Sequence, residues 1–332
     1  MPRFSVIVPV YNRIDEVADL MESLSRQTYT DFEAIIVEDG SSEPCKDVVE
    51  SYKGKIDAHY HYKPNEGRSI ARNYGMERSK GDFLIFFDSD CVIPPDYFKT
   101  LSEELDKCPL DCFGGPDAAH DSFSSTQKAI NYSMTSFLTT GGIRGGKIQL
   151  EKFTPRTFNM GFSRKVYSKV GGFREMFSED IDMSTRIRQA GFNIGLIRPA
   201  FVYHKRRVDF RKFLRQVYVF GMSRITLKLL YPDSLKAVHL MPAAFVAGLV
   251  AMAILGIAVS PWFLLPVGIY FLAIFVCALF ATRSAVIAAK AVPASFIQLA
   301  GYGCGFIQAF FTKIVLRHGR DIDQEVAMRK GK

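Results

Sequence analysis

The stretch FLIFFDSD, residues 83–90, consists of five apolar residues followed by an aspartate, a serine and a second aspartate. The apolar run is too short to cross a membrane and is typical of a strand that is covered on both faces. Ligands of open α/β sheets bind at the carboxyl ends of the strands, which is where Asp88 and Asp90 are expected to lie. Two carboxylates at this spacing repel each other unless a cation lies between them, and Mg²⁺ and Mn²⁺ prefer oxygen ligands. The stretch predicts a metal-diphosphate site, with a solvated acidic turn as the alternative for an isolated Asp-x-Asp.

Strand patterns and helix patterns alternate along the first part of the chain. Runs at residues 4–10, 32–37 and 56–62 predict three further strands, and residues with helical periodicity separate them. This alternation predicts a Rossmann-like, doubly wound, mostly parallel α/β sheet. Residues 108–152 have weaker periodicity and contain a glycine cluster, so we expect a mobile loop there. The cluster consists of Gly141, Gly142, Gly145 and Gly146.

Charged residues almost vanish between residues 237 and 316, whereas the preceding residues mix charged, polar and apolar side chains. Apolar segments at 235–259 and 262–281 are each long enough to cross a hydrocarbon core of about 30 Å. A third apolar segment, 292–314, contains glycines. It is expected either to cross the membrane or to lie in it as a re-entrant or interfacial segment. We therefore predict a transmembrane region over residues 235–316.

Basic residues outnumber acidic residues by 42 to 34 and give the chain a formal net charge of +8. Many of them crowd just before the first apolar segment, and the positive-inside rule then places the soluble domain in the cytoplasm. The chain starts directly with a strand pattern and not with an apolar targeting region, so export of the soluble domain is not expected. Together with the apolar segments, this predicts a multi-pass protein of the inner (cytoplasmic) membrane. The basic tail, residues 317–332, would lie outside if all three segments crossed. Nucleic-acid binding is not expected, because the basic residues cluster beside the apolar segments rather than along a groove.

A helical pattern links the soluble part to the first apolar segment. Apolar residues recur on one face of residues 208–234, whereas Arg211, Lys212 and Arg215 point elsewhere. This pattern predicts an amphipathic interfacial helix and linker, with an ordinary helix packed on the domain as the alternative. The apolar face consists of Phe210, Phe213, Leu214, Val217, Phe220 and Gly221. The soluble domain is expected to extend over residues 1–207.

The six cysteines show no metal-ligand spacing, and two of them lie in the apolar segments. Reduced, mostly buried thiols are therefore expected. A disulfide or metal site at Cys108 and Cys112 is the alternative, although disulfides are rare in the cytoplasm.

Seven short motifs follow one another along the soluble part. They are SVIVPVYN at 5–12, EDGSS at 38–42, the segment 65–73, DSD at 88–90, NMG at 159–161, SED at 178–180 and His204. Together and in this order they strongly resemble the motifs of family 2 glycosyltransferases, and the resemblance covers residues 4 to about 218. It implies an A-type nucleotide-sugar (GT-A) fold, a UDP- or GDP-type nucleotide-sugar donor, a divalent metal and inversion at the anomeric carbon.

The resemblance implies that the donor binds along the carboxyl ends of the strands. Asp39 would accept hydrogen bonds from the nucleobase, although a carboxylate at this position can also cap the next turn. Arg68 and Arg72 lie at a helix start, where arginine pairs well with phosphate oxygens, and one of them is expected to be a plain surface charge. The donor-binding residues expected on this basis are Pro9, Tyr11, Asn12, Asp39, Arg68, Arg72, Asp88 and Ser89.

The expected cofactor is Mn²⁺ or Mg²⁺. The resemblance implies that Asp90 is a direct ligand and that Asp88 contacts the donor ribose or a metal-bound water. His204 follows a strand pattern and is expected as a further metal ligand, with a purely structural histidine as the alternative. The cation would neutralise the charge that develops on the departing diphosphate.

The SED motif carries the predicted catalytic residues. Asp180 is the expected general base, which takes the proton from the acceptor hydroxyl, and Glu179 would orient the acceptor or Asp180. Acidic residues at a helix start are often caps, and this is the role expected of Asp182. The acceptor-binding residues implied by the resemblance are Asn159, Met160 and Gly161.

The expected function is that of an inverting, hexosyltransferase-type enzyme. It would move one sugar to a hydroxyl of a membrane-associated, polyprenyl-linked glycan in cell-envelope polysaccharide or glycoconjugate synthesis. Processive members of the family carry a Gln-x-x-Arg-Trp motif after the base, whereas the only tryptophan here, Trp262, lies in an apolar segment. The alternative is a polyprenyl-phosphate sugar synthase, whose acceptor is the lipid phosphate. An inactive membrane scaffold that binds a nucleotide sugar is a third reading.

Overall fold

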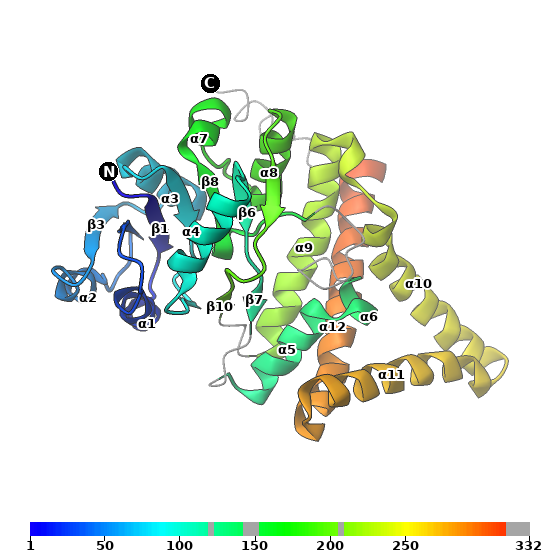
Figure 1. Ribbon diagram of the computed structural model, residues 1–332. Helices are drawn as coiled ribbons and strands as arrows, with labels where there is room; N and C mark the ends of the chain where they lie inside the picture. The colour runs from blue at the N-terminus through cyan, green and yellow to red at the C-terminus, as the bar shows by residue number, and fades with distance from the viewer. Residues whose placement is uncertain (119–122, 142–152, 205–208, 317–332) are drawn as a thin grey trace. The chain divides into compact units, whose positions relative to one another are not determined.

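A computed structural model of the chain describes residues 1–118, 123–141, 153–204 and 209–316 (Figure 1). The strands are β1 (Phe4–Val10), β2 (Phe32–Asp39), β3 (Asp57–Lys63), β4 (Phe83–Phe86), β5 (Cys91–Val92), β6 (Cys112–Gly114), β7 (Asp117–Ala118), β8 (Met160–Ser163), β9 (Ile194–Leu196) and β10 (Val202–His204). The α-helices are α1 (Ile14–Ser25), α2 (Lys46–Ser51), α3 (Arg68–Arg78), α4 (Tyr97–Lys107), α5 (Ser125–Thr135), α6 (Phe137–Thr140), α7 (Arg164–Val170), α8 (Glu179–Gln189), α9 (Phe210–Leu230), α10 (Ala237–Ala258), α11 (Leu265–Thr282) and α12 (Ala285–Ala309).

The chain forms two compact units. Unit 1 comprises Met1–His120 and Lys152–Lys205, and unit 2 comprises Asp121–Glu151 and Arg206–Lys332. The sequence predicts a single soluble domain over residues 1–207, whereas the structure assigns the segment with α5 and α6 to the unit that contains the apolar helices.

Unit 1 is built on a seven-stranded sheet in the order β3-β2-β1-β4-β8-β6-β9. Strands β1 to β4 are parallel, and β8 runs antiparallel to both of its neighbours, β4 and β6. The predicted mostly parallel α/β sheet is therefore confirmed. The expected strand at residues 4–10 has the bounds of β1, and the other two strands agree within two residues.

Helices cover both faces of this sheet, as the buried apolar strands require. One face packs against α1, α2 and α4 through side chains such as Val6, Leu20 and Leu101. The other face packs against α3, α7 and α8 through side chains such as Ile7 and Met183. Because the apolar faces are filled by helices, the carboxyl ends of the parallel strands are left as the edge at which polar loops emerge.

A second, three-stranded sheet in the order β5-β10-β7 lies within unit 1. Strand β10 is antiparallel to β5, with His204 opposite Cys91. Strand β5 begins directly after the Asp88-Ser89-Asp90 motif. The pairing therefore brings the end of the soluble part of the chain back to the carboxyl end of β4.

The expected loop at residues 108–152 contains regular structure that the sequence analysis did not predict. Strands β6 and β7 and helices α5 and α6 fall within it, and a capping box between Ser124 and Gln127 starts α5. Gly141 ends α6 in a left-handed conformation. The other three glycines of the cluster, and the basic tail, lie outside the described residues. Helix α5 gains its stability from packing against other helices of unit 2, which local periodicity does not reveal.

Three helical segments of unit 2 are long and apolar enough to cross a membrane, namely Ala237–Ala258, Pro261–Thr282 and Ala285–Val315. The first two match the predicted segments closely. The third starts seven residues earlier than predicted, at 285 rather than 292, and includes Lys290 and Pro293. The ammonium group of Lys290 donates hydrogen bonds to the hydroxyl groups of Ser125, at 2.7 Å, and Thr126, at 3.1 Å. These two α5 side chains therefore compensate the positive charge that this apolar helix carries.

Helix α9 lies beside α12 within unit 2 (Figure 1), and its apolar face packs against that helix and α5. Phe213 and Val217 are fully buried there. Leu214 on the same face remains 44% exposed, so the face is covered only in part, and the placement of this helix at a membrane interface stays a prediction. Gly221 faces the backbone of Tyr302, and Gly305 faces the backbone of Tyr218, so the helices approach too closely for larger side chains. Arg211, Lys212 and Arg215 are exposed, as expected.

Replacement of Gly221 by alanine should destabilise unit 2. A Cβ atom at this position would lie 2.0 Å from the carbonyl oxygen of Tyr302, so the helices must separate, at a cost of about 1–3 kcal/mol. Thermal unfolding of the full chain in detergent measures this effect as a lower midpoint. The matched control is Gly248→Ala in α10, where nothing lies within 4 Å of the new atom. Equal midpoints for the two variants would contradict the close α9–α12 packing.

The six cysteines form no disulfide. Cys108 is exposed at the end of α4, whereas Cys112 is buried in β6. The pairing considered as an alternative is therefore absent from the described structure.

Candidate active site

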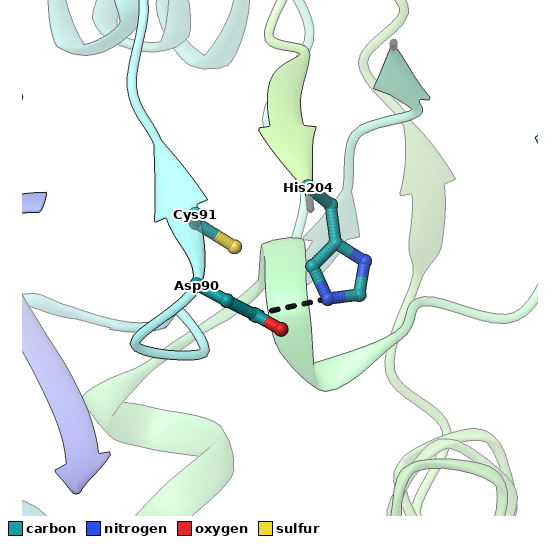
Figure 2. Close-up of side chains that lie close together, drawn as sticks. All are labelled: Asp90, Cys91 and His204. Atoms are coloured by element: carbon teal, nitrogen blue, oxygen red, sulfur yellow. Dashed lines mark ion pairs between the residues drawn. The ribbon is translucent and has the colours of Figure 1, made fainter. Parts of the chain in front are cut away.

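The carboxylate of Asp90 and the imidazole of His204 point toward each other in unit 1 (Figure 2). The Nε2 atom of His204 is 3.1 Å from Oδ1 of Asp90 and 4.0 Å from Oδ2 of Asp88. The pairing of β5 with β10 sets these distances, because it places His204 opposite the residue that follows Asp90. Two carboxylates and an imidazole nitrogen form a donor set that suits a divalent ion such as Mn²⁺.

Cys91 completes the cluster, since its Sγ atom lies within 4.8 Å of the ligand atoms of Asp90 and His204. Burial, reinforced by the carboxylates of Asp90 and Asp88, raises the pKa of the Cys91 thiol well above its usual range. The thiolate is the metal-binding form of cysteine. The carboxylates and the imidazole are therefore better suited than Cys91 to hold a hard divalent ion. The ring of Phe158 stacks on the imidazole of His204, with the two ring centroids 4.6 Å apart, and fixes the orientation of the imidazole.

Arg72 links the aspartates after β4 to the start of α8. Its guanidinium group donates to Oδ1 of Asp88 at 2.8 Å and to Oε1 of Glu179 at 2.9 Å. Both Arg72 and Glu179 are almost fully buried. The sequence predicts that Arg72 binds donor phosphate, whereas the structure uses its guanidinium to join two acidic segments. Arg68 reaches Glu179 from the surface at 2.9 Å and keeps 57% of its side chain exposed.

Each of the three acids at the start of α8 has an arginine partner. Glu179 pairs with Arg72, and Oδ2 of Asp180 lies 3.2 Å from Nη1 of Arg156. Asp182 lies in the first turn of α8, as predicted, and is fully buried, where it binds Arg174 and Arg186. The preceding residue, Ser178, has a φ of 63°, a left-handed conformation that costs free energy in a residue other than glycine. This turn exposes the Asp180 carboxylate in part while Glu179 stays buried.

Asp39 holds the loop between β3 and α3. Its carboxylate accepts hydrogen bonds from the Lys63 ammonium at 2.7 Å and from the backbone N–H groups of Glu66 and Gly67 at 3.0 and 2.8 Å. Burial opposes the charge on Lys63, but hydrogen bonds to Asp39 and Glu66 outweigh it and raise the pKa of the ammonium group. The structure thus shows the loop-capping role that was the alternative for Asp39. Contact with a nucleobase remains a prediction.

The first two strand-to-helix turns are fastened to each other. The side-chain oxygen of Asn12 accepts a hydrogen bond from the backbone N–H of Ser42 at 2.8 Å, and the backbone N–H of Asn12 donates to Oγ of Ser41 at 2.7 Å. Ser41 in turn donates to the buried carboxylate of Glu38. Tyr11 is half exposed in the same turn, and Pro9 is partly buried in β1. These three residues of the predicted donor site therefore lie at the carboxyl end of β1, where hydrogen bonds join the two turns.

The predicted acceptor-binding residues are buried. Asn159 accepts a hydrogen bond from the Tyr97 hydroxyl at 2.6 Å and donates to the carbonyl oxygen of Ala200 at 2.9 Å. Met160 lies in the core, and the ring of Phe113 covers Gly161 so closely that no side chain would fit. The side chains of Asn159 and Met160 are fully buried in this structure, and acceptor binding by this segment stays a prediction.

Sequence reasoning did not identify Lys63 and Arg156. Lys63 could have been found from the strand ends, because it lies directly opposite Asp39 in the β2–β3 register. Arg156 lies in a segment without regular periodicity, so no signal in the sequence pairs it with Asp180.

Comparison with known proteins supports the assignment suggested by the motifs. Residues 5–171, half of the chain, match the model of the family described as Glycosyl transferase family 2. The putative glycosyltransferase EpsH of Bacillus subtilis is 38% identical over 111 residues, which are 32% of this chain and 32% of EpsH. The putative teichuronic acid biosynthesis glycosyltransferase TuaG of the same organism is 38% identical over 92 residues, 27% of this chain and 36% of TuaG. The chain thus spans about a third of the length of these relatives.

A solved structure has a similar fold. The mannosyltransferase PcManGT from Pyrobaculum calidifontis, in complex with GDP-Man and Mn²⁺, has a TM-score of 0.59 and 16% sequence identity. The match covers 94% of this chain and 88% of that chain. At this identity the likeness concerns the fold alone. Taken together with the match to the family model, the ordered motifs and the sheet that carries them, this establishes that the chain belongs to glycosyltransferase family 2.

Proposed function

We propose that the protein is an inverting, metal-dependent glycosyltransferase that moves one sugar from a nucleotide-sugar donor to a hydroxyl of a membrane-associated glycan. Membership of the family supports the reaction class. The relatives EpsH and TuaG, the second of which is named for teichuronic acid biosynthesis, favour a role in polysaccharide synthesis. A GDP-type donor is one option, since the fold resembles that of a mannosyltransferase solved with GDP-Man. A UDP-type donor is the other.

The bridge through Arg72 is the observation that carries this proposal. One buried guanidinium binds Asp88 of the predicted metal and donor site and Glu179 beside the predicted base. A rigid link of this kind would hold the donor diphosphate and the acceptor hydroxyl in one alignment, and alignment is a large part of catalytic power. A purely structural acidic turn would not need to be tied to a second acidic segment across the sheet edge.

Asp90 and His204 would hold the metal ion, with Asp88 beside them. When bound, the ion would stabilise the negative charge that develops on the diphosphate leaving group. Mn²⁺ and Mg²⁺ both remain options. Arg68, whose side chain is half exposed, is better placed than the buried Arg72 to meet a donor phosphate. Arg72 would act as a positioning residue.

Asp180 would remove the proton of the acceptor hydroxyl. Its Oδ1 atom accepts a hydrogen bond from the backbone N–H of Ile181 at 2.8 Å, and its Oδ2 atom accepts one from the guanidinium group of Arg156 at 3.2 Å. Each carboxylate oxygen has a second lone pair, which would take the proton. Arg156 would hold the carboxylate in place during the transfer. The buried Glu179 would fix the start of α8 rather than touch the acceptor.

The three long apolar helices would attach the enzyme to a membrane as a multi-pass protein. We propose that the glycosyltransferase domain lies on the cytoplasmic side of the inner membrane and that the acceptor is linked to a polyprenyl carrier. An enzyme and an acceptor that share one bilayer meet in two dimensions, which favours a lipid-linked acceptor over a free one. Support for this step comes from the apolar helices and the basic residues that precede them.

Asp180→Asn tests the role of the base. If the acceptor is a hydroxyl, the loss of the general base should lower kcat by about 10²–10⁴-fold. The measurement is release of nucleoside diphosphate from UDP- and GDP-sugars, with and without Mn²⁺, in the presence of lipid-linked acceptors. Asp47→Asn, an exposed aspartate at the start of α2, is the matched control and should keep full activity. Near-normal turnover of Asp180→Asn would contradict a hydroxyl acceptor and favour transfer to a lipid phosphate, which needs no strong base.

A further inference from the structure

A second cluster of potential metal ligands lies at the opposite ends of the strands from the candidate active site. It consists of Glu33 at the start of β2 and Asp57 and His59 at the start of β3, and its ligand atoms all lie within 4.8 Å of one another. Ser5, Glu33 and Asp57 are direct neighbours across β1, β2 and β3, so they form one row of the sheet. Because side chains alternate between the two faces of a strand, His59 points to the same face as Asp57.

Glu33 is a buried carboxylate without a permanent cationic partner among the described residues. Only 1% of the residue is exposed. Its Oε1 atom accepts hydrogen bonds from the Ser5 hydroxyl and from the backbone N–H of Lys80, both at 2.6 Å. Its Oε2 atom lies 3.7 Å from Nε2 of His59, an imidazole that is neutral unless protonated. A buried carboxylate is costly unless a positive charge compensates it.

The imidazole of His59 points one nitrogen at both carboxylates. Nε2 is 3.0 Å from Oδ1 of Asp57 and 3.7 Å from Oε2 of Glu33. This nitrogen is buried, and neither contact has the geometry of a hydrogen bond. Three electron-rich atoms thus face one point without a hydrogen bond between them. A cation at that point would explain the arrangement.

We propose that Glu33, Asp57 and His59 bind a divalent transition-metal ion such as Zn²⁺. Zn–N and Zn–O bonds are about 2.0–2.2 Å long, so two ligands of one ion lie roughly 3.0–3.5 Å apart. The distances from Nε2 of His59 to the two carboxylates, 3.0 and 3.7 Å, are close to this range. One imidazole with two carboxylates suits Zn²⁺. The ion would neutralise Glu33 and fasten the edge strand β3 to β2. It has no part in sugar transfer, because the site lies at the other ends of these strands from Asp39 and Lys63.

Zinc binding by the full chain in detergent, without a histidine tag, tests this site. The background is the double variant Asp90→Ala and His204→Ala, which removes the predicted ligands of the active site. After dialysis against Zn²⁺, metal analysis should find one zinc per chain. His59→Ala or Asp57→Asn in this background should abolish the binding or weaken it at least tenfold. His61→Ala is the matched control, because it removes the next imidazole on the same face of β3 and should leave the zinc in place.

Retention of the zinc in His59→Ala and Asp57→Asn, equal loss in His61→Ala, or no zinc in the background variant would overturn the proposal. Asp57 is exposed, so its replacement by asparagine does not disturb the core and the test does not depend on a misfolded variant. Added Zn²⁺ should also raise the midpoint of thermal unfolding in the background variant but not after Asp57→Asn. Sugar transfer is not the readout, so this result is separate from that of the proposed function.

Discussion

Replacement of Asp90 by alanine should lower kcat for sugar transfer by about 10³-fold. The carboxylate lies 3.1 Å from His204 and next to Asp88, and it is the expected direct ligand of the divalent ion. Without it the charge on the departing diphosphate would lose its main electrostatic stabilisation, which is worth several kcal/mol of the barrier. Steady-state release of nucleoside diphosphate over a range of Mn²⁺ concentrations measures the effect.

His204→Ala should weaken the apparent affinity for Mn²⁺ more than it lowers kcat at saturating metal, because the two carboxylates remain. Asp47→Ala, at an exposed position, is the control for the loss of an aspartate and should behave like the parent protein. Full turnover of the parent in excess EDTA, or an Asp90→Ala variant as active as the parent, would rule out a metal at this site.

Replacement of Arg72 by alanine should destabilise unit 1 by about 3–5 kcal/mol. Removal of one partner from a buried ion pair leaves an uncompensated charge, and here Glu179 would lose its buried partner while Asp88 loses a hydrogen bond. For a unit of this size the midpoint of thermal unfolding should fall by roughly 10 °C. Arg72→Lys should recover only part of this loss, because one ammonium group cannot reproduce the planar fork that reaches both carboxylates.

Arg68→Ala is the matched control for this experiment. Arg68 pairs with the same carboxylate, but its side chain is 57% exposed, so the pair is worth at most about 1 kcal/mol. Thermal unfolding by circular dichroism should therefore separate the two variants clearly. An Arg72→Ala variant that unfolds at the temperature of Arg68→Ala would show that the buried bridge is not important for stability. Such a result would also remove the main support for a rigid link between the two acidic segments.

Most of the α/β sheet was predictable because its signals are local. The apolar run at 83–87, which Asp88 and Asp90 follow, contains β4, and the run at 4–10 has the bounds of β1. The first two apolar helices were predictable for the same reason, since their length and composition are visible in a short window. Helices α5 and α6 were missed. The apolar residues of α5 face partners on α9, α11 and α12 that are distant in sequence, so the local pattern contained little information about this helix. Helix α6 is only four residues long, too short for a periodic pattern.

The sequence by itself determined which residue types stand at the carboxyl ends of the strands. The apolar runs that form the strands and the polar turns that follow them are local features, visible in a few consecutive residues. Only the tertiary structure decided what each of these residues contacts. Strand β10 brings His204 to Asp90, Arg72 turns from an expected phosphate ligand into a buried bridge, and Asn159 lies inside the core. The close approach of α9 to α12 likewise buries Phe213 and Val217, two residues of the apolar face of α9. The physical reason is that burial and ion pairing depend on segments far apart along the chain, and their free energies are set only when those segments meet.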